Sequence, residues 1–91
     1  GCYFRDTTTL AIRKLGAYKI TATDTNGTGD IFHGAYAYGI LNNMNTIERL
    51  KFASAAAASV AELPQGSIRK PNLERIKEFI SSHSELEISD I

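Results

Sequence analysis

The chain has 91 residues, a length that supports one modest hydrophobic core and no more than one domain. Ten basic and ten acidic side chains cancel, so no long-range field favours nucleic acid or an anionic membrane surface. The apolar fraction of 43% and the charged fraction of 22% are those of an ordinary globular protein. No apolar run approaches the roughly 20 residues that a membrane span needs. The single cysteine, Cys2, excludes an intrachain disulfide and predicts a cytoplasmic protein.

The first part of the chain predicts strands. Residues 2–4 and the segment TLAIRKL are strand-like, and the polar spacer RDTTT separates them. In AYKITATD, residues 17–24, apolar and polar side chains alternate, which predicts a half-buried strand. The chain opens directly on a strand without a starting methionine, and so few strands would leave open sheet edges. We therefore expect a piece of a larger domain.

Three helices are predicted after these strands. The first covers about residues 29–41, the second about residues 47–61 after a cap at Asn45 or Thr46, and the third runs from the cap Asn72 to about residue 82. Residues at three- and four-residue spacing predict the inward face of each helix: Phe32, Ala35, Tyr36, Gly39 and Ile40 in the first, Leu50, Ala53, Ala57 and Val60 in the second, and Leu73, Ile76, Phe79 and Ile80 in the third. The tail HSELEISDI lacks clear periodicity, so we expect it to fray and His83 to be solvated. This order of elements suits the end of an α/β domain with helices laid on a sheet.

The stretch DTNGTGDIF joins the third predicted strand to the first predicted helix and has three interpretations. The simplest is a polar turn in which Gly27 and Gly29 adopt positive φ and Thr28 or Asp30 caps the helix. The second, an EF-hand-type calcium loop, is excluded because the twelfth position should be a bidentate Glu and is Ala35.

The third interpretation is phosphate chemistry. A glycine-rich turn at a helix N-terminus presents backbone N–H groups and the positive end of the helix dipole, which together favour an anion. Neither a P-loop nor a dinucleotide-binding fingerprint is present. Asp30 would repel a phosphate that is merely bound, but a phosphotransferase needs a base there to deprotonate the attacking hydroxyl. The residues thus favour a kinase, while the polar-turn interpretation stays open.

The longer stretch DTNGTGDIFHGAYAYGI resembles the C-terminal signature of the ribokinase-like (PfkB-type) carbohydrate kinases, D-T-x-G-A-G-D-x-F-x-G-A. The segment ERLKFASAAAASVAELPQGSIRKPNLERI is similar to the part of the family that follows. The resemblance implies the C-terminal part of a ribokinase-like three-layer α/β/α domain, with the lid and the N-terminal part absent from residues 1–91. It also implies transfer of the ATP γ-phosphoryl group to a hydroxyl of a sugar or sugar-like acceptor, with Mg²⁺ bridging the phosphates.

The resemblance further assigns roles to individual residues. Asp30 would be the catalytic base, and Gly27, Thr28 and Gly29 would form the anion hole, with Thr28 replacing the commoner alanine. Ser54 would lie near the adenine pocket, which the stretch from Ala55 to Ala58 would line. The remaining assignment is a monovalent cation, usually K⁺, held by Asp24, Asn26 and the carbonyls of Val60, Leu63 and Gly66.

Two alternatives from other classes are kept. One is a nucleotide- or anion-binding module without turnover. The other is an interaction fragment that oligomerises through its open sheet edges, with a homodimer as the expected assembly. The expected partners are ATP and a small sugar-like substrate, and the isolated fragment is expected to be inactive. His33 is expected on a helix surface, and Tyr36 and Tyr38 are expected to pack rather than to form an aromatic platform.

Overall fold

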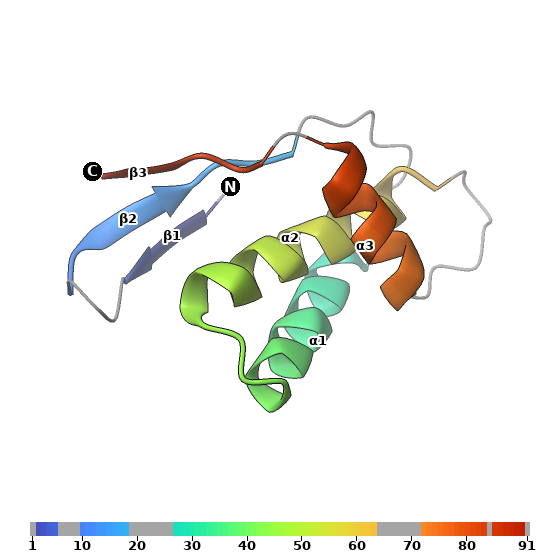
Figure 1. Ribbon diagram of the computed structural model, residues 1–91, viewed down its shortest axis with the longest axis horizontal. Coiled ribbons are helices and arrows are strands. Elements are labelled where there is room, and N and C mark those ends of the chain that lie inside the picture. The colour runs from blue at the N-terminus through green and yellow to red at the C-terminus, as the bar shows by residue number, and fades with distance from the viewer. Residues whose placement is uncertain (1, 6–9, 19–26, 64–71, 84, 91) are drawn as a thin grey trace.

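The chain folds into a small three-stranded sheet at one end and three helices at the other (Figure 1). A computed structural model describes residues 2–5, 10–18, 27–63, 72–83 and 85–90. Its strands and helices, in chain order, are β1 (Cys2–Arg5), β2 (Ile12–Leu15), α1 (Thr28–Leu41), α2 (Thr46–Ala61), α3 (Leu73–Ser82) and β3 (Ile88–Asp90).

The sheet is antiparallel, with β2 between β1 and β3. Leu15 lies opposite Cys2 on one side and Ile88 on the other, and it is 1% exposed. Along β1, Cys2 and Phe4 are half-buried while Tyr3 and Arg5 are exposed, as the period of two in a strand requires. Both predicted N-terminal strands are confirmed. Of the strand predicted over residues 17–24, Ala17 and Tyr18 lie outside any strand, and residues 19–24 are not among the described residues.

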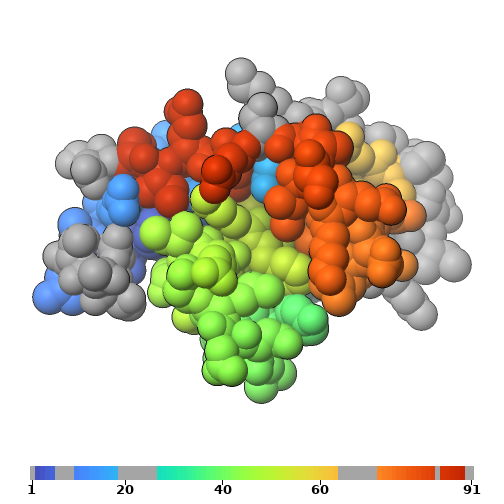
Figure 2. Space-filling model, viewed as in Figure 1, coloured from blue at the N-terminus to red at the C-terminus, as the bar shows by residue number. Residues whose placement is uncertain are grey.

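The prediction that the C-terminal tail frays is wrong. Ile88–Asp90 pairs with β2, and the Gly16 amide donates a hydrogen bond of 2.8 Å to the Glu87 carbonyl. Leu86 is only 7% exposed and packs with Leu15 and Leu50. Figure 2 shows the C-terminal segment (red) against the surface of α2, next to α3 (orange). A strand of three residues is too short to display an alternating pattern, so only tertiary pairing reveals it.

The three predicted helices are confirmed within about a residue, and their caps explain where two of them start. At the start of α2, the Asn45 side chain accepts a hydrogen bond of 2.8 Å from the Glu48 amide. At the start of α3, Asn72 accepts a bond of 3.2 Å from the Arg75 amide. Both bonds satisfy amides that lack intrahelical partners. Asn45, rather than Thr46, is therefore the cap.

Helix α2 forms the centre of the core because it packs against both α1 and α3. The predicted stripe of Leu50, Ala53 and Val60 is buried, while Ala57 is half-buried. Burial extends well beyond this stripe, since two helices cover α2. The additional buried residues of α2 are Phe52, Ala55, Ala56, Ser59 and Ala61. Apart from Phe52, these side chains are small, which lets the neighbouring helices approach closely.

The outer helices bury narrower faces than the sequence predicts. On α3, Ile76 and Phe79 are buried as expected, but Leu73 and Ile80 are 41% and 40% exposed. On α1, Ile40 is 52% exposed although it was expected on the apolar face. Each outer helix contacts the core mainly through α2, so only one narrow stripe is covered. The α/β class is confirmed, and the three-layer architecture stays a prediction.

Candidate functional site

Helix α1 begins at a glycine in the left-handed conformation. Gly27 is its N-cap, with φ 78° and ψ 0°, and it provides no side-chain hydrogen bond. The Ile31 amide donates a helical bond of 3.1 Å to the Gly27 carbonyl, so the amides of residues 28–30 lie before the first turn closes. The expectation that Thr28 or Asp30 caps the helix is wrong, because the helix starts one residue earlier than predicted and the cap falls on Gly27.

Positions 27 and 29 differ in whether the backbone requires a glycine. The positive φ of Gly27 disfavours any L side chain. Gly29 is helical and does not have a positive φ, so the expectation of a positive φ at this residue is wrong. A Cβ added at Gly29 would meet nothing within 4 Å. Neither the backbone conformation nor the packing explains a glycine at position 29. Because Gly29 has no side chain, none of its own atoms beyond the backbone would obstruct a ligand at this helix end.

Asp30 and Glu48 occupy the same position, the third residue of a helix, but of the two only Glu48 bonds to another side chain in the residues that the structure describes. The Glu48 carboxylate accepts a bond of 2.8 Å from the Asn45 side chain, which closes a reciprocal cap at the start of α2. Asp30 is exposed, and no hydrogen bond or ion pair joins it to another residue in the described part of the chain. An acid at a helix start is favourable with the dipole. Its carboxylate nevertheless remains available for chemistry.

The residues expected near adenine divide into two environments. Ser54 and Ala58 are half-buried on α2 and line a cavity of about 230 Å³ together with Cys2, Tyr18 and Phe32. Phe32 belongs to α1 and follows Asp30 by two residues, so the helix that carries the acid also contributes to this cavity. Ala55, in contrast, is 0% exposed and lies in the packing between helices.

The expected cation ligands are only partly described. Asp24, Asn26 and Gly66 lie outside the described residues. Val60 is buried near the end of α2, and its carbonyl accepts a bond of 3.0 Å from the Leu63 amide. The N–H of the C-cap residue Glu62 also bonds to this carbonyl, so the Val60 oxygen already accepts two hydrogen bonds at the helix end. In the described part of the chain, no group of three or more His, Cys, Asp or Glu side chains could hold a metal ion.

The structure confirms three side-chain expectations and corrects one. His33 is exposed on α1, Tyr38 stacks on Phe52 with ring centroids 5.3 Å apart, and Tyr36 is half-buried. His83 is not solvated as expected. Its ring stacks on Phe79 at 3.7 Å and meets Tyr18 edge-on at 5.8 Å. The residue lies at the end of α3, where the tail turns back to the sheet, and its sequence neighbours give no sign of this contact.

Sequence reasoning missed Arg49. Its Nε donates to the Met44 carbonyl at 3.1 Å and its Nη1 donates to the Tyr36 hydroxyl at 3.3 Å, so it ties α2 to α1. The guanidinium carbon lies 5.2 Å from the Tyr36 ring centroid. Gly39 makes room for the Arg49 side chain, since an added Cβ would overlap Arg49 Cγ. No local spacing signals a contact across 13 residues.

Two side chains near the C-terminal turn have shifted pKa values. Burial raises the pKa of the Tyr18 phenol above its ordinary value of 10.0, and the Glu85 carboxylate adds to this effect. The hydrogen bond from Lys51, at 2.6 Å, lowers the pKa of Glu85 below its ordinary value of 4.5, and the Lys51 charge adds to this effect. Lys51 and Glu85 join α2 to the tail, and Tyr18 packs against Phe79 and His83.

Comparison with known proteins points to one family. A sequence model of the pfkB family of carbohydrate kinases matches residues 1–73. A 5-dehydro-2-deoxygluconokinase of Clostridium perfringens is 34% identical over 86 residues, which cover 89% of this chain and 25% of that protein. A 5-dehydro-2-deoxygluconokinase of Clostridium tetani is 32% identical over 72 residues, covering 79% of this chain and 21% of that protein. A ribokinase of Lactococcus lactis is 37% identical over 57 residues, covering 63% of this chain and 18% of its own length. The chain thus spans about a quarter or less of these relatives.

No helix in the described ranges is long and apolar enough to cross a membrane.

Proposed function

Because the chain belongs to the pfkB family of carbohydrate kinases, we propose that the complete polypeptide carrying it transfers the ATP γ-phosphoryl group to a sugar or sugar-like hydroxyl. The family match covers residues 1–73 and includes the whole turn from Asp24 to Asp30. The relatives named above are two 5-dehydro-2-deoxygluconokinases and a ribokinase, which supports a sugar-like acceptor.

One observation carries this proposal: Asp30 is an exposed acid at a helix start, and no other described residue forms a hydrogen bond or ion pair with it. The equivalent acid of α2, Glu48, accepts a hydrogen bond from the side chain of its N-cap residue Asn45. The N-cap of α1 is Gly27, which has no side chain, so Asp30 takes no part in such a reciprocal cap. A carboxylate beside an anion-binding helix end is unfavourable for simple phosphate binding but suits a base that acts on a neighbouring hydroxyl.

The proposed step assigns each group a task. The hydroxyl oxygen of the acceptor forms a bond to the γ-phosphorus, and the Asp30 carboxylate accepts the proton that this hydroxyl loses. The bond between that phosphorus and the β–γ bridging oxygen breaks, and ADP leaves with the electron pair. The amides of Gly27, Thr28 and Gly29 face the phosphates and stabilise the charge that develops on them.

The remaining ligand assignments are extensions of this proposal. Ser54 and Ala58, which line one cavity with Phe32, would face the adenine, and Ala55 would support them from the core. Mg²⁺ would neutralise phosphate charge, bound chiefly by ATP and water. K⁺ would be held by Asp24, Asn26 and the carbonyls of Val60, Leu63 and Gly66.

Substitution Asp30→Asn in the complete polypeptide tests the proposal. Asn keeps the shape and removes the base, so we expect kcat for ADP release to fall by at least about 10²-fold, the usual contribution of a general base. Binding of ATP should persist. Glu48→Gln is the matched control, since it alters an acid at the same helical position without touching the turn. Unchanged turnover in Asp30→Asn would contradict the proposed role.

A polypeptide that binds ATP yet releases no ADP with any acceptor would instead support a non-catalytic nucleotide-binding module. The 91-residue chain alone is expected to show no turnover, because it spans about a quarter or less of its relatives.

A further inference from the structure

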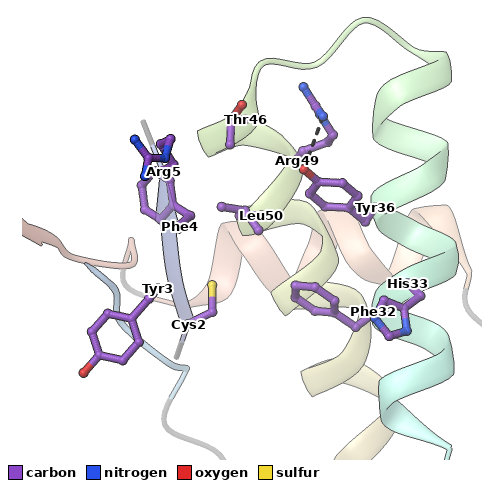
Figure 3. A pocket seen from close by; sticks show the side chains of 10 residues that line it. All are labelled: Cys2, Tyr3, Phe4, Arg5, Phe32, His33, Tyr36, Thr46, Arg49 and Leu50. Atoms are coloured by element: carbon purple, nitrogen blue, oxygen red, sulfur yellow. Dashed lines mark hydrogen bonds between the residues drawn. The ribbon is translucent and has the colours of Figure 1, made fainter. Parts of the chain in front are cut away.

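A cleft of about 550 Å³ separates β1 from the two longest helices. Figure 3 shows Cys2 and Phe4 of β1 facing Leu50 of α2 and Phe32 of α1 across it, while Tyr3 points away. The volume is typical of sites that bind small organic molecules. Cys2, Phe4 and Phe32 are half-buried, so their apolar surfaces form a wall that water covers only in part.

Among the described residues that line this cleft, the two with a full charge are Arg5 and Arg49, and no Asp or Glu is among them. Arg5 donates to the Leu10 carbonyl at 3.3 Å, and Arg49 donates to Met44 and Tyr36, so neither guanidinium pairs with a carboxylate in the described ranges. Guanidinium groups stay protonated at all physiological pH values. Each has more donors than these bonds use.

An apolar wall beside two guanidinium groups that pair with no carboxylate in the described ranges suits one chemical class. The apolar surface gains from contact with rings or alkyl chains, and the half-buried Arg49 attracts an anion more strongly than an exposed cation such as Arg5 does. We propose that this cleft binds a small amphipathic anion, an aromatic or alkyl carboxylate or phosphate, with its apolar body against Phe4, Phe32 and Leu50 and its anionic group toward Arg5 and Arg49. None of the described residues 27–30 lines the cleft, which shares Cys2 and Phe32 with the neighbouring cavity at Ser54.

Cys2 provides a direct readout because it is the sole cysteine and lines the cleft. The rate of its alkylation by iodoacetamide, a neutral reagent, is measured by mass spectrometry with three probes: naphthoate, naphthyl phosphate and naphthyl methanol. We expect saturating naphthoate or naphthyl phosphate to slow alkylation by at least about threefold, since the bound rings cover the thiol. The neutral alcohol should need at least about fivefold higher concentration for the same effect, because it lacks the charge-assisted hydrogen bond.

Variants assign the effect to the cleft. Arg5→Gln should raise the naphthoate concentration needed for half-protection by about fivefold, and the exposed Arg75→Gln on α3 should leave it unchanged. Arg49→Gln should raise the naphthoate concentration for half-protection as Arg5→Gln does, provided that circular dichroism shows intact helices. If the helices of Arg49→Gln are not intact, the result for Arg5→Gln alone decides the test. A preference for naphthoate or for the phosphate identifies the head group. Equal protection by the alcohol, or none by any probe, overturns the proposal.

Discussion

The imidazole of His83 lies stacked on the ring of Phe79, with centroids 3.7 Å apart and planes 16° apart. Its Nδ1 donates a hydrogen bond of 2.8 Å to the Phe79 carbonyl, and its Nε2 lies 3.9 Å from a Glu62 carboxylate oxygen at the end of α2. Tyr18, which follows β2, meets both rings edge-on. One side chain at the end of α3 thus joins three segments of the chain.

Replacing His83 by Ala should therefore lower the free energy of unfolding by about 1 kcal/mol, the usual contribution of an aromatic pair beyond its buried area. Urea unfolding of the 91-residue chain measures this difference. His33→Ala is the matched control, because His33 is exposed on α1 and should have little effect. Equal stabilities of the two variants would show that the stack does not hold the C-terminal turn.

Gly39→Ala should destabilise the chain, because the new Cβ would overlap Arg49 Cγ and lie 3.3 Å from Met44 Sδ. Arg49 cannot move away without losing its bonds to Met44 and Tyr36. We expect a loss of about 1–3 kcal/mol, as for other overpacked sites. Gly34→Ala, on the same helix with open space around it, should instead gain about 0.5–1 kcal/mol from helix propensity. Thermal unfolding of both variants measures the opposite signs, and two stabilised variants would contradict this packing.

Leu86→Ala tests whether the C-terminal tail is part of the core. Leu86 is 7% exposed and packs with Leu15 and Leu50, so its truncation should cost about 2–5 kcal/mol, the range for buried leucines. Leu73→Ala, at a leucine that is 41% exposed, is the control and should cost much less. Urea unfolding compares the two, and a small effect of Leu86→Ala would restore the expectation of a frayed tail.

Alkaline pH should weaken the fold through Tyr18. Its pKa is raised above 10.0 by burial, with a further contribution from Glu85, so the folded state favours the neutral phenol. This contribution to stability is complete below pH 10 and is lost as the pH rises through the raised pKa. Tyr18→Phe should remove part of the alkaline loss, while Tyr38→Phe should not. Stability measured by urea unfolding from pH 8 to pH 11 would contradict the assignment if both variants matched the unsubstituted chain.

Acidic pH should weaken the contact between α2 and the tail. Since the bond from Lys51 lowers the pKa of Glu85, the ion pair contributes stability above pH 4.5 and loses it as the pH falls through the lowered pKa. Glu85→Gln should flatten this part of the stability profile, and Glu74→Gln on the first turn of α3 serves as the control. An unchanged profile for Glu85→Gln would show that the pair adds nothing.

Gly29→Ala separates folding from phosphate binding. The added methyl group meets no neighbour and favours the helix, so stability should be unchanged or slightly higher. If the first-turn amides hold phosphates, the same methyl group should weaken ATP binding by the complete polypeptide by about tenfold, because the phosphate oxygens must approach those amides closely. Calorimetric titration with ATP measures this. Gly34→Ala is again the control, and unchanged affinity in Gly29→Ala would remove the amides from the proposed site.

The helices were predictable from the sequence because their signals are local. Asn45 and Asn72 are recognisable caps, and the apolar spacing around Ala53 or Ile76 shows on which face each helix packs. The tail strand and the His83 stack were not, because both depend on contacts between distant residues. The pairing of Leu15 with Ile88 joins positions far apart in the chain, and no periodicity encodes it.

The candidate site was predicted in a similarly uneven way. The turn at Gly27 has a strong local signature, and its positive φ was expected from the sequence. The exact start of α1 was not expected from the sequence. The interpretation of Asp30 as the helix cap is wrong because the N-cap in the structure is Gly27. Arg49 and the cleft beside β1 depend on how α2 lies against α1 and the sheet, which no local spacing reports.

The most direct test of the central claim is acceptor-dependent ADP formation by the complete polypeptide that carries this segment. The acceptor panel should include ribose and 5-dehydro-2-deoxygluconate, the sugars implied by the names of its relatives. We predict that at least one sugar-like acceptor stimulates ADP release well above the rate with ATP and Mg²⁺ alone, and that Asp30→Asn abolishes the stimulation. Tight ATP binding without acceptor-dependent ADP formation across the panel would contradict a kinase and favour a nucleotide-binding module.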